Sequence, residues 1–298
     1  MNEISLADAP ARAGRGLIAW VENKSILTPT SGYLAPGFTH TINAYQGCSF
    51  AGALCGTFCY AQHNHWITHG REWGLYGAKA DVRSAYRRDH DRIKRPARGE
   101  PGRLVIYMSS STDPYLPQES RLGLTRALLE EMLERPPDAL VIQTHHIQIE
   151  RDVDLIVALS LKCRVWASIT VETDQERLPG FPPHACSPRR RLETLGRLRA
   201  SGILTQAAVS PLLPLADVEG FGRRLDAACD RVILDHFLIG DGSPGGARTR
   251  RTSLIERLAG SGQERWSRLD VLWETRDALA GILGASRVLV GREGFCAV

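Results

Sequence analysis

The sequence lacks a long apolar run: no stretch reaches the roughly 18 apolar residues that a membrane-spanning helix requires. Residues 1–15 carry acidic side chains and contain no apolar core of the kind found in secretory signals. The chain also has no internal repeat and no low-complexity linker. We therefore expect a cytoplasmic globular protein without a membrane partner.

No charge of one sign dominates the 298 residues, because 37 Lys and Arg oppose 33 Asp and Glu and leave a formal net charge of +4. Hydrophobic residues make up 43% and charged residues 23%, a balance typical of globular enzymes. This mild basic excess does not by itself indicate a nucleic-acid partner. Arginine is nevertheless dense at residues 83–98, 189–199 and 248–251, which could contact phosphates or form solvated helix faces.

Short apolar runs alternate with helical patterns over most of the chain. The runs are rich in Val, Ile and Leu, as strands buried on both faces should be. They predict six strands: Thr39–Tyr45, Arg103–Ser109, Ala139–Thr144, Arg164–Thr170, Leu204–Ser210 and Arg231–Phe237. Apolar residues spaced by three or four predict helices between the strands: Leu122–Arg135, Val153–Leu161, Pro188–Ser201 and Val218–Cys229.

This alternation favours the α/β class, with a parallel sheet joined by right-handed crossovers. Six strand–helix units could form an incomplete (β/α)6 TIM-type barrel, in which functional groups lie where strands end. An irregular N-terminal lead-in (residues 1–38) would precede the partial barrel (39–240), and a C-terminal helical extension (241–298) would follow it. In the C-terminal region we expect a loop at 238–262, a helix near Gln263–Leu283 and a short strand, Arg287–Val290.

Seven cysteines, an odd number in a chain expected to be cytosolic, disfavour a disulfide framework and favour metal binding. Cys48, Cys55 and Cys59 fall within twelve residues, in a glycine-rich loop directly after the first predicted strand. Three thiolates can hold three irons of a four-iron cluster and leave the fourth iron open to a ligand. No fourth cysteine lies nearby, because the next one is Cys163.

Zinc is the alternative metal for this segment. Cys55, Cys59 and His63 are spaced by four residues and would share one face of a helix. Cysteine and histidine are both good zinc ligands. A non-catalytic zinc-binding protein is therefore the second hypothesis. Metal analysis separates the two, because an iron–sulfur protein contains sulfide and a zinc protein does not.

The cysteine loop and several downstream motifs resemble radical SAM proteins related to spore photoproduct lyase. The Tyr-x-Gly-Cys entry to Cys48, the Cys-Tyr-Ala that begins at Cys59, and the block from Thr112 to Glu119 are similar to segments of that family. The resemblance covers roughly residues 26–237. Further matching segments follow in the family's order: Leu124–Arg126, Glu150–Leu155, Ser168–Thr170, Arg191–Leu192 and Ser210–Pro214.

The resemblance implies a [4Fe-4S] cluster on Cys48, Cys55 and Cys59 that binds S-adenosylmethionine. Once reduced by a partner such as flavodoxin or ferredoxin, it would cleave this cofactor to methionine and a 5′-deoxyadenosyl radical. The radical would abstract hydrogen from a substrate, either nucleic acid or a small molecule or peptide; the resemblance does not identify further catalytic residues. The expected cofactor contacts are polar groups at strand ends: Ser110, Ser111, Thr112, Asp113, His145, Ser168 and Glu172.

Three departures from the family pattern restrict this expectation. The cysteine spacing is Cys-x6-Cys-x3-Cys, whereas relatives usually have Cys-x3-Cys-x2-Cys. His145 stands where relatives carry a lysine thought to meet the cofactor carboxylate, and it could replace that lysine if protonated. The spore lyase has a hydrogen-donating cysteine where this chain has Ser109–Ser111. A serine hydroxyl is a poor hydrogen-atom donor, so thymine-dimer reversal by the same route is not expected.

Overall fold

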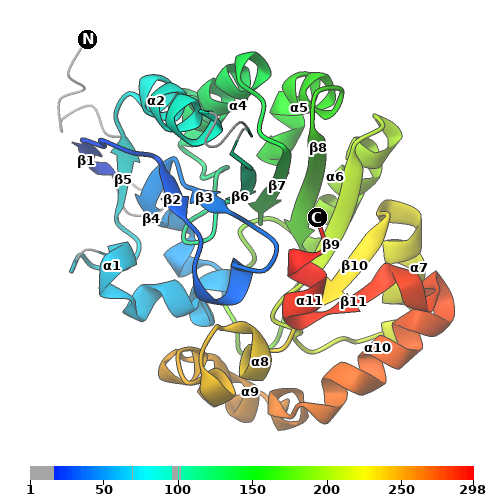
Figure 1. Cartoon of the computed structure of the whole chain (residues 1–298). Coiled ribbons are helices and arrows are strands. Elements are labelled where there is room, and N and C mark those ends of the chain that lie inside the picture. Colours follow the sequence, from blue (N-terminus) through cyan, green and yellow to red (C-terminus); the bar gives the residue numbers. More distant parts are fainter. Residues whose placement is uncertain (1–16, 69, 96–99, 101) are drawn as a thin grey trace.

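The computed structural model describes residues 17–68, 70–95, 100 and 102–298. The first sixteen residues of the expected lead-in lie outside this described part, so the expectation for residues 1–15 falls outside it too. Part of the arginine-dense segment 83–98 lies outside it as well. Within the described chain, strands and helices alternate, and the helices surround a twisted sheet (Figure 1).

The main sheet has eight strands in the order β11-β10-β9-β8-β7-β6-β3-β2. Neighbouring strands are parallel except for β2 and β3, which confirms the predicted parallel α/β sheet. The order is linear, so in the described residues the sheet is open, with β11 and β2 at its edges. The strands are β2 (Leu27–Pro29), β3 (His40–Ile42), β6 (Val105–Met108), β7 (Ala139–Thr144), β8 (Arg164–Thr170), β9 (Leu204–Val209), β10 (Arg231–Leu234) and β11 (Val288–Val290).

The outer face of the sheet is covered by amphipathic helices. Each has apolar residues at a spacing of three or four that pack into one continuous core with alternate strand residues such as Ile106, Ile142 and Val209. The four predicted helices are confirmed within two residues at each end, and α2 agrees with the solvated-helix interpretation of the segment 83–98. The covering helices are α2 (Val82–Lys94), α4 (Leu124–Glu134), α5 (Val153–Ser160), α6 (Pro188–Ala200), α7 (Val218–Ala228) and α10 (Asp270–Leu283).

The inner face of the sheet has a second apolar cluster, built by the other set of alternate strand residues. Tyr107, Trp166 and Ile233 pack there against Phe38 and Phe295. The covering segments come from opposite ends of the described chain: the short helix η2 (Gly32–Leu34) and the terminal helix α11 (Gly291–Cys296). Both faces of the central strands are therefore buried, as their Val, Ile and Leu content predicted.

A smaller sheet in the order β1-β5-β4 lies beside the main one and was not predicted. Its strands are β1 (Leu17–Val21), β5 (Tyr76–Lys79) and β4 (Tyr45–Gly47). The predicted strand Thr39–Tyr45 is wrong at its end, because β3 stops at Ile42 and Tyr45 already pairs with β5. This change of sheet turns the chain toward the cysteine loop.

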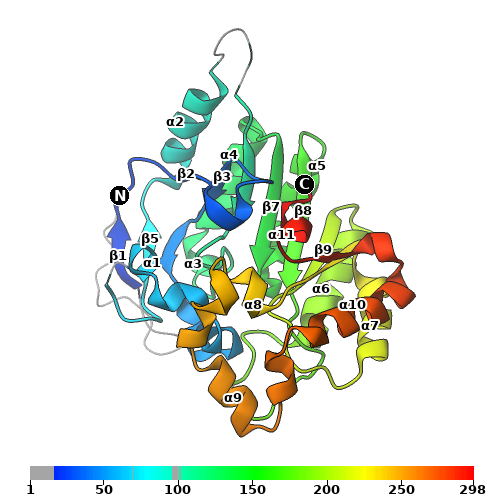
Figure 2. The ribbon, with the colours of Figure 1, turned by 60° about the horizontal axis from the view of Figure 1, so that its bottom comes forward.

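The predicted loop at residues 238–262 is wrong, because this segment contains short helices. They are α8 (Phe237–Gly240), two single turns (Pro244–Gly246 and Thr249–Arg251) and α9 (Leu254–Gly260). Leu254 and Leu258 of α9 pack with Leu54 and Phe58 of the cysteine loop, which gives the glycine-rich segment its own small core. In Figures 1 and 2, α8 and α9 lie on the side of the sheet toward which its parallel strands point.

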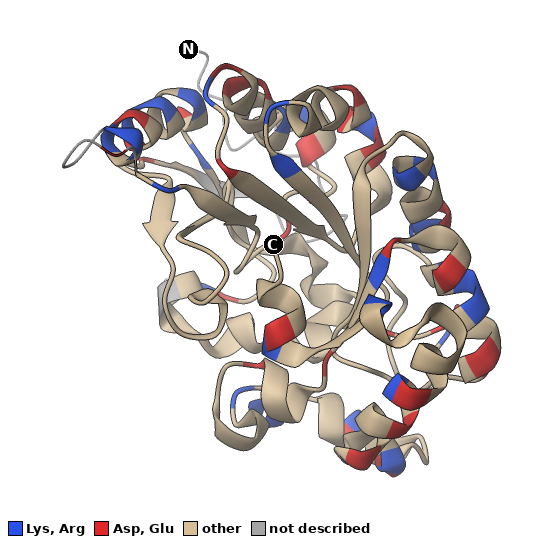
Figure 3. Ribbon diagram, turned by 45° about the vertical axis from the view of Figure 1, so that its right-hand side comes forward, with Lys and Arg blue, Asp and Glu red and all other residues tan. Residues whose placement is uncertain are grey.

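Charged residues of both signs are interspersed on the outer helices, as Figure 3 shows. Many arginines of the dense segments form ion pairs there: Arg189 with Glu193, and Arg199 with Asp230, each at 2.9 Å. This pairing favours the solvated-helix interpretation of the segment 189–199. In the described part of the chain, no helix is both long and apolar enough to cross a membrane.

Candidate functional site

The cysteine loop follows β4 and consists of three consecutive single turns: Ser49–Gly52, Leu54–Thr57 and Tyr60–His63. These turns are tight because glycine permits close backbone approach. A Cβ on Gly56 would lie 2.0 Å from the carbonyl oxygen of Ala51. By contrast, a Cβ on Gly52 would meet no atom within 4 Å. The longer spacing between the first two cysteines is thus taken up by compact turns.

Hydrogen bonds fix the cysteine loop to the segment that follows β6. The hydroxyl of Thr112 donates to the carbonyl oxygen of Gly47 at 2.5 Å, just before the first cysteine. The hydroxyl of Tyr60, just after the third cysteine, donates to the carbonyl oxygen of Ser110 at 2.8 Å. The predicted strand-end residues therefore lie against the loop, although these contacts are structural.

Three serines at the end of β6 lie in a strained turn. Ser109 has a φ of 76°, in the left-handed region that a non-glycine residue rarely adopts, and its buried hydroxyl has no partner in the described structure. Asn43 holds the next two serines: its amide donates to the Ser110 hydroxyl at 3.5 Å, and its carbonyl accepts from the Ser111 backbone at 3.3 Å. The backbone around these expected cofactor contacts is thus fixed before any ligand binds.

The three cysteines of the loop face one another and two carboxylates. Burial, and then the neighbouring Cys59 and Asp113, raise the pKa of Cys48 above its ordinary value. Burial, and then Cys48 and Glu172, also raise the pKa of Cys55, while burial raises the pKa of Cys59 to about 11. Thiolates are disfavoured among so many negative groups unless cations neutralise them. This donor set therefore fits an iron–sulfur cluster, whose irons would supply that charge.

A single zinc ion fits this loop less well. In the parts of the chain that the structure describes, no three His, Cys, Asp or Glu side chains are grouped to hold one metal ion. A tetrahedral zinc site with bonds of about 2.3 Å needs its sulfur atoms about 3.8 Å apart. Cys55, Cys59 and His63 also do not share a helix face, because the loop breaks into separate turns and His63 is exposed. The zinc alternative is not favoured.

Asp113 is buried at the end of β6, 3% exposed, and both of its carboxylate oxygens are occupied. Oδ1 accepts from the backbone of Tyr115 at 2.8 Å and from the hydroxyl of Thr144 at 2.7 Å. Oδ2 accepts from the backbone of His145 at 2.8 Å and lies 3.4 Å from Nδ1 of its ring. Burial would raise the pKa of Asp113, but these bonds and the His145 ring hold it below its ordinary value.

Glu172 follows β8 and is 1% exposed. Its Oε2 pairs with Nη1 of the buried Arg191 at 2.7 Å, and its Oε1 lies 3.5 Å from Nε2 of His145. Burial would raise the pKa of Glu172, but the charge of Arg191, with the neighbouring His145 and His184 rings, holds it at about 2. The carboxylate is therefore ionised throughout the physiological range.

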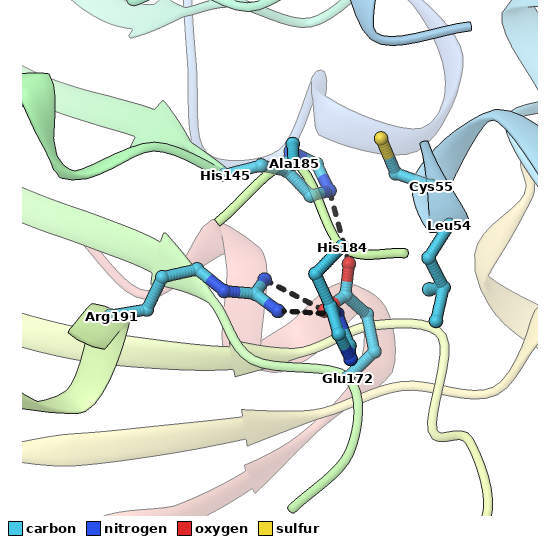
Figure 4. Close-up of a pocket in the computed structure, with 7 residues that line it drawn as sticks. All are labelled: Leu54, Cys55, His145, Glu172, His184, Ala185 and Arg191. Carbon is cyan, nitrogen blue, oxygen red and sulfur yellow. Dashed lines mark hydrogen bonds and ion pairs between the residues drawn. The ribbon is translucent and has the colours of Figure 1, made fainter. Parts of the chain in front are cut away.

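The side chains of Asp113, His145, Glu172 and Arg191 form a continuous chain of alternating acidic and basic groups. Arg191 Nη2 also donates to Nδ1 of His184 at 3.1 Å, so His184 is in the tautomer whose Nε2 donates to the carbonyl oxygen of Gln175 at 2.9 Å. Figure 4 shows the resulting pocket, with Cys55 opposite His145 and Glu172. The pocket is lined by Leu54, Cys55, His145, Glu172, His184, Ala185 and Arg191.

Sequence reasoning did not place Arg191 and His184 in the site. Arg191 had two available signals: it belongs to the matching segment Arg191–Leu192, and it precedes Leu195 and Leu198 on the apolar face of α6, where a charged residue needs a buried partner. His184 lies in an irregular segment before α6 and had no such signal. Only the folded chain brings these two residues to the end of β8.

Ser168 was expected at the cofactor but lies deeper, on the inner face of the sheet. Its hydroxyl is fully buried, donates to Oε1 of Gln143 at 2.6 Å and accepts from Nε2 of Gln206 at 2.9 Å. Tyr107 also donates to Gln143 Oε1, at 3.2 Å. Ser168 thus belongs to a hydrogen-bonded row across β6, β7, β8 and β9, and is not among the residues that line the pocket.

No family model matches the sequence. An uncharacterized protein of Methanocaldococcus jannaschii is 30% identical over 203 residues, which span 67% of this chain and 69% of that protein. An uncharacterized protein of the Acidianus two-tailed virus is 32% identical over 146 residues, and one of Mycobacterium tuberculosis is 26% identical over 196. This chain spans about half the length of each of these two, 44% and 54% respectively.

Solved structures of spore photoproduct lyase are similar in fold. One, complexed with dinucleoside spore photoproduct, superimposes with a TM-score of 0.57 at 15% identity and covers 88% of this chain and 79% of that one. A mutant of the same enzyme gives a TM-score of 0.59 at 13% identity and covers 91% of this chain and 80% of that one. At such low identity the comparison establishes the shared fold alone.

Proposed function

This chain belongs to the same family as the uncharacterized protein of Methanocaldococcus jannaschii, and we propose that it is a radical SAM enzyme. The observation that carries the proposal is the loop of three thiols held against the strand-end segment after β6, with Cys55 lining the same pocket as Glu172. Its fold, shared with spore photoproduct lyase, supports the same class. The proposed cluster ligands are Cys48, Cys55 and Cys59.

The charges around the pocket support a cationic cofactor. When bound, a [4Fe-4S] cluster would supply the electron that cleaves S-adenosylmethionine to methionine and a 5′-deoxyadenosyl radical. This cofactor has a sulfonium and an ammonium group against a single carboxylate, so it carries a net positive charge. Asp113 and Glu172 are both held ionised at the pocket, and Arg191 balances only part of their charge. The pocket therefore attracts the cofactor electrostatically.

The cofactor carboxylate needs a cation or a hydrogen-bond donor, and the pocket offers two candidates. His145 lies with its two ring nitrogens 3.4 and 3.5 Å from Asp113 and Glu172, so one of these contacts must open before the ring can meet another carboxylate. Arg191 has a fixed charge, and its buried Nε has no partner within the described structure. We therefore propose Arg191 as a second candidate for this contact, beside His145.

The electron donor and the substrate class remain proposals. A small redox protein such as flavodoxin or ferredoxin is the proposed donor. For the substrate, nucleic acid is distinguished from a small molecule or peptide by the salt dependence of binding. A nucleic-acid substrate requires DNA or RNA affinity that falls steeply as salt rises, whereas no binding at low salt contradicts it.

Metal and product analysis tests the proposed function directly. Protein purified without oxygen should contain about four irons and four sulfides, and reduction with S-adenosylmethionine should yield 5′-deoxyadenosine. Replacing Cys48, Cys55 and Cys59 together by alanine should abolish both signals. Cys229→Ala is the matched control, because this buried cysteine donates to the Leu225 carbonyl oxygen of α7, away from the loop. One zinc without sulfide would contradict the proposal.

A further inference from the structure

Two arginines begin strands at the end of the main sheet opposite the pocket. Arg164 is the first residue of β8, and Arg231 is the first residue of β10. Side chains alternate along a strand, so both arginines project from the inner face, as Trp166 and Ile233 of its apolar cluster do. The guanidinium carbon of Arg231 lies 3.7 Å from the centroid of the Trp166 ring, and that of Arg164 lies 6.0 Å from it. Two cations therefore gather at one indole ring.

The guanidinium of Arg231 is held along one side and free at its end. Its Nε and Nη2 donate to Oε1 of the fully buried Gln206, at 2.8 and 2.6 Å, and the Trp166 ring supports its plane. Its Nη1 forms no hydrogen bond to the described residues and is not buried, so it faces solvent. Such a guanidinium has little rotamer freedom left to lose and is preorganised to donate to an oxyanion.

Neither arginine has an acidic partner in the part of the chain that the structure describes. Asp230 directly precedes Arg231, but its carboxylate pairs with Arg199 at 2.9 Å and accepts from the backbone and hydroxyl of Thr205 at 2.8 and 2.9 Å. Burial, and then the charge of Arg164, lower the pKa of Arg231 to about 10, which leaves it protonated at neutral pH. Two uncompensated positive charges are thus held near each other.

The surface around the two arginines is open to solvent. The side chain of Arg164 is exposed. Strand β9 lies between β8 and β10, and its first residue, Leu204, is 38% exposed. A ligand can therefore reach Nη1 of Arg231 from solvent, where the long side chain of Arg164 can meet it, without a buried cavity.

We propose that Arg164 and Arg231 form a binding site for a phosphate group, whose oxygens accept from Arg231 Nη1 and from the Arg164 guanidinium. Guanidinium groups match phosphate oxygens in geometry, and two cations match the nearly two negative charges of a phosphate monoester at neutral pH. A carboxylate has one charge, and so does each phosphate of a nucleic acid, which would need a longer row of cations. The site does not depend on the proposed radical chemistry, because it lies at the other end of the sheet.

Isothermal titration calorimetry with inorganic phosphate, on protein purified without oxygen and kept at low salt, tests the site. One phosphate should bind with a Kd on the order of 1 mM, and acetate, which has a single charge, should bind at least about tenfold more weakly. Glycerol 3-phosphate then distinguishes two sources of this group. Binding at least as tight as that of inorganic phosphate identifies a monoester, whereas weaker binding identifies the free ion.

Three variants assign the binding to this site. Arg164→Gln removes no hydrogen bond within the described residues, so the variant should fold, and it should bind phosphate at least about tenfold more weakly. Arg231→Lys keeps the charge but loses the planar fork, and it should also weaken binding. Arg189→Gln, which removes an equal charge from the outer helix α6, is the matched control and should bind phosphate as the native protein does.

The unfolding temperature gives a second readout. In chloride, Arg164→Gln should unfold at the same temperature as the native protein or higher, because it relieves repulsion between two cations. Replacing chloride by phosphate at equal ionic strength should raise the unfolding temperature of the native protein more than that of Arg164→Gln. This comparison removes the general stabilising effect of phosphate, which acts on both proteins.

Four results would overturn the site. They are the absence of phosphate binding at low salt, equal phosphate binding by the native protein and Arg164→Gln, acetate binding as tight as that of phosphate, and an equal rise of both unfolding temperatures in phosphate. An oligonucleotide that binds through Arg164 while inorganic phosphate does not bind would assign the arginines to nucleic acid and likewise contradict the proposal.

Discussion

Replacing Arg191 by methionine removes the cation that neutralises Glu172 in the buried pocket. Methionine has a similar length and packs readily, so the change removes mainly charge and hydrogen bonds. Arg191 and Glu172 are 2% and 1% exposed, and Nη1 lies 2.7 Å from Oε2. Breaking a buried pair by removing one partner costs about 3–5 kcal/mol, because the remaining charge is uncompensated. The Thr170 carbonyl oxygen also loses its donor, which adds about 1 kcal/mol.

A double-mutant cycle separates the charge effect from lost packing. Arg191→Met should lower the free energy of unfolding by about 4 kcal/mol. The double variant Arg191→Met with Glu172→Gln should lose less, because glutamine leaves no unpaired charge. Arg189→Met on the same helix is the control. Its ion pair with Glu193 is exposed, so its loss should cost less than about 1 kcal/mol.

The pH dependence of unfolding gives an independent check. In the native protein the pKa of Glu172 is about 2, below its ordinary value of 4.5, so its contribution to stability is present above pH 4.5 and lost as pH falls toward 2. Without Arg191, burial should raise this pKa above 4.5, and the stability of the variant should fall as pH rises. Chemical unfolding of both proteins between about pH 5.5 and 8 measures the difference. The native protein and Arg191→Met should differ in free energy of unfolding by an amount that grows with pH. A difference that stays constant would refute this reasoning, and so would an Arg191→Met loss of stability no larger than that of Arg189→Met.

Two further predictions follow from close contacts and burial. Gly56→Ala should reduce iron content and lower the unfolding temperature, because its Cβ would lie 2.0 Å from the Ala51 carbonyl oxygen; Gly52→Ala, with no atom within 4 Å, should change neither. Equal iron content in the two variants would contradict the tight-turn account of the loop. Since burial raises the pKa of Asp235 from 3.8 to about 7, the folded state binds its proton more tightly, and stability should fall by up to about 4 kcal/mol as pH rises from about 4 to 7. Asp235→Asn should remove this decline, and an unchanged decline in unfolding scans would show that other groups cause it.

Strand-end reasoning found part of the site. Asp113, His145 and Glu172 were expected near one another because parallel strands β6, β7 and β8 end at the same edge of the sheet, and the structure places them in contact. Ser168 was expected there too, but it precedes Glu172 by four residues, about 13 Å along an extended strand. Its hydroxyl is therefore satisfied by glutamines of the neighbouring strands.

Elements with weak local signals escaped prediction. Strands β4 and β5 have three and four residues, and they exist because they pair with each other beside the main sheet. Helix α9 lies in a segment that its glycines and arginines suggested was a loop, and it is stabilised by apolar contacts with the cysteine loop. Short elements depend on such tertiary contacts more than on their own sequence, because a few residues provide too little local stabilisation.

The sequence by itself determined the parallel α/β sheet, because strands buried on both faces must be apolar throughout and the helices between them must be apolar on one face. It also determined that three cysteines share one glycine-rich loop. Only the tertiary structure decided which charged groups surround those thiols. Arg191 and His184 line the pocket beside Cys55, and their contacts depend on neighbours distant along the chain.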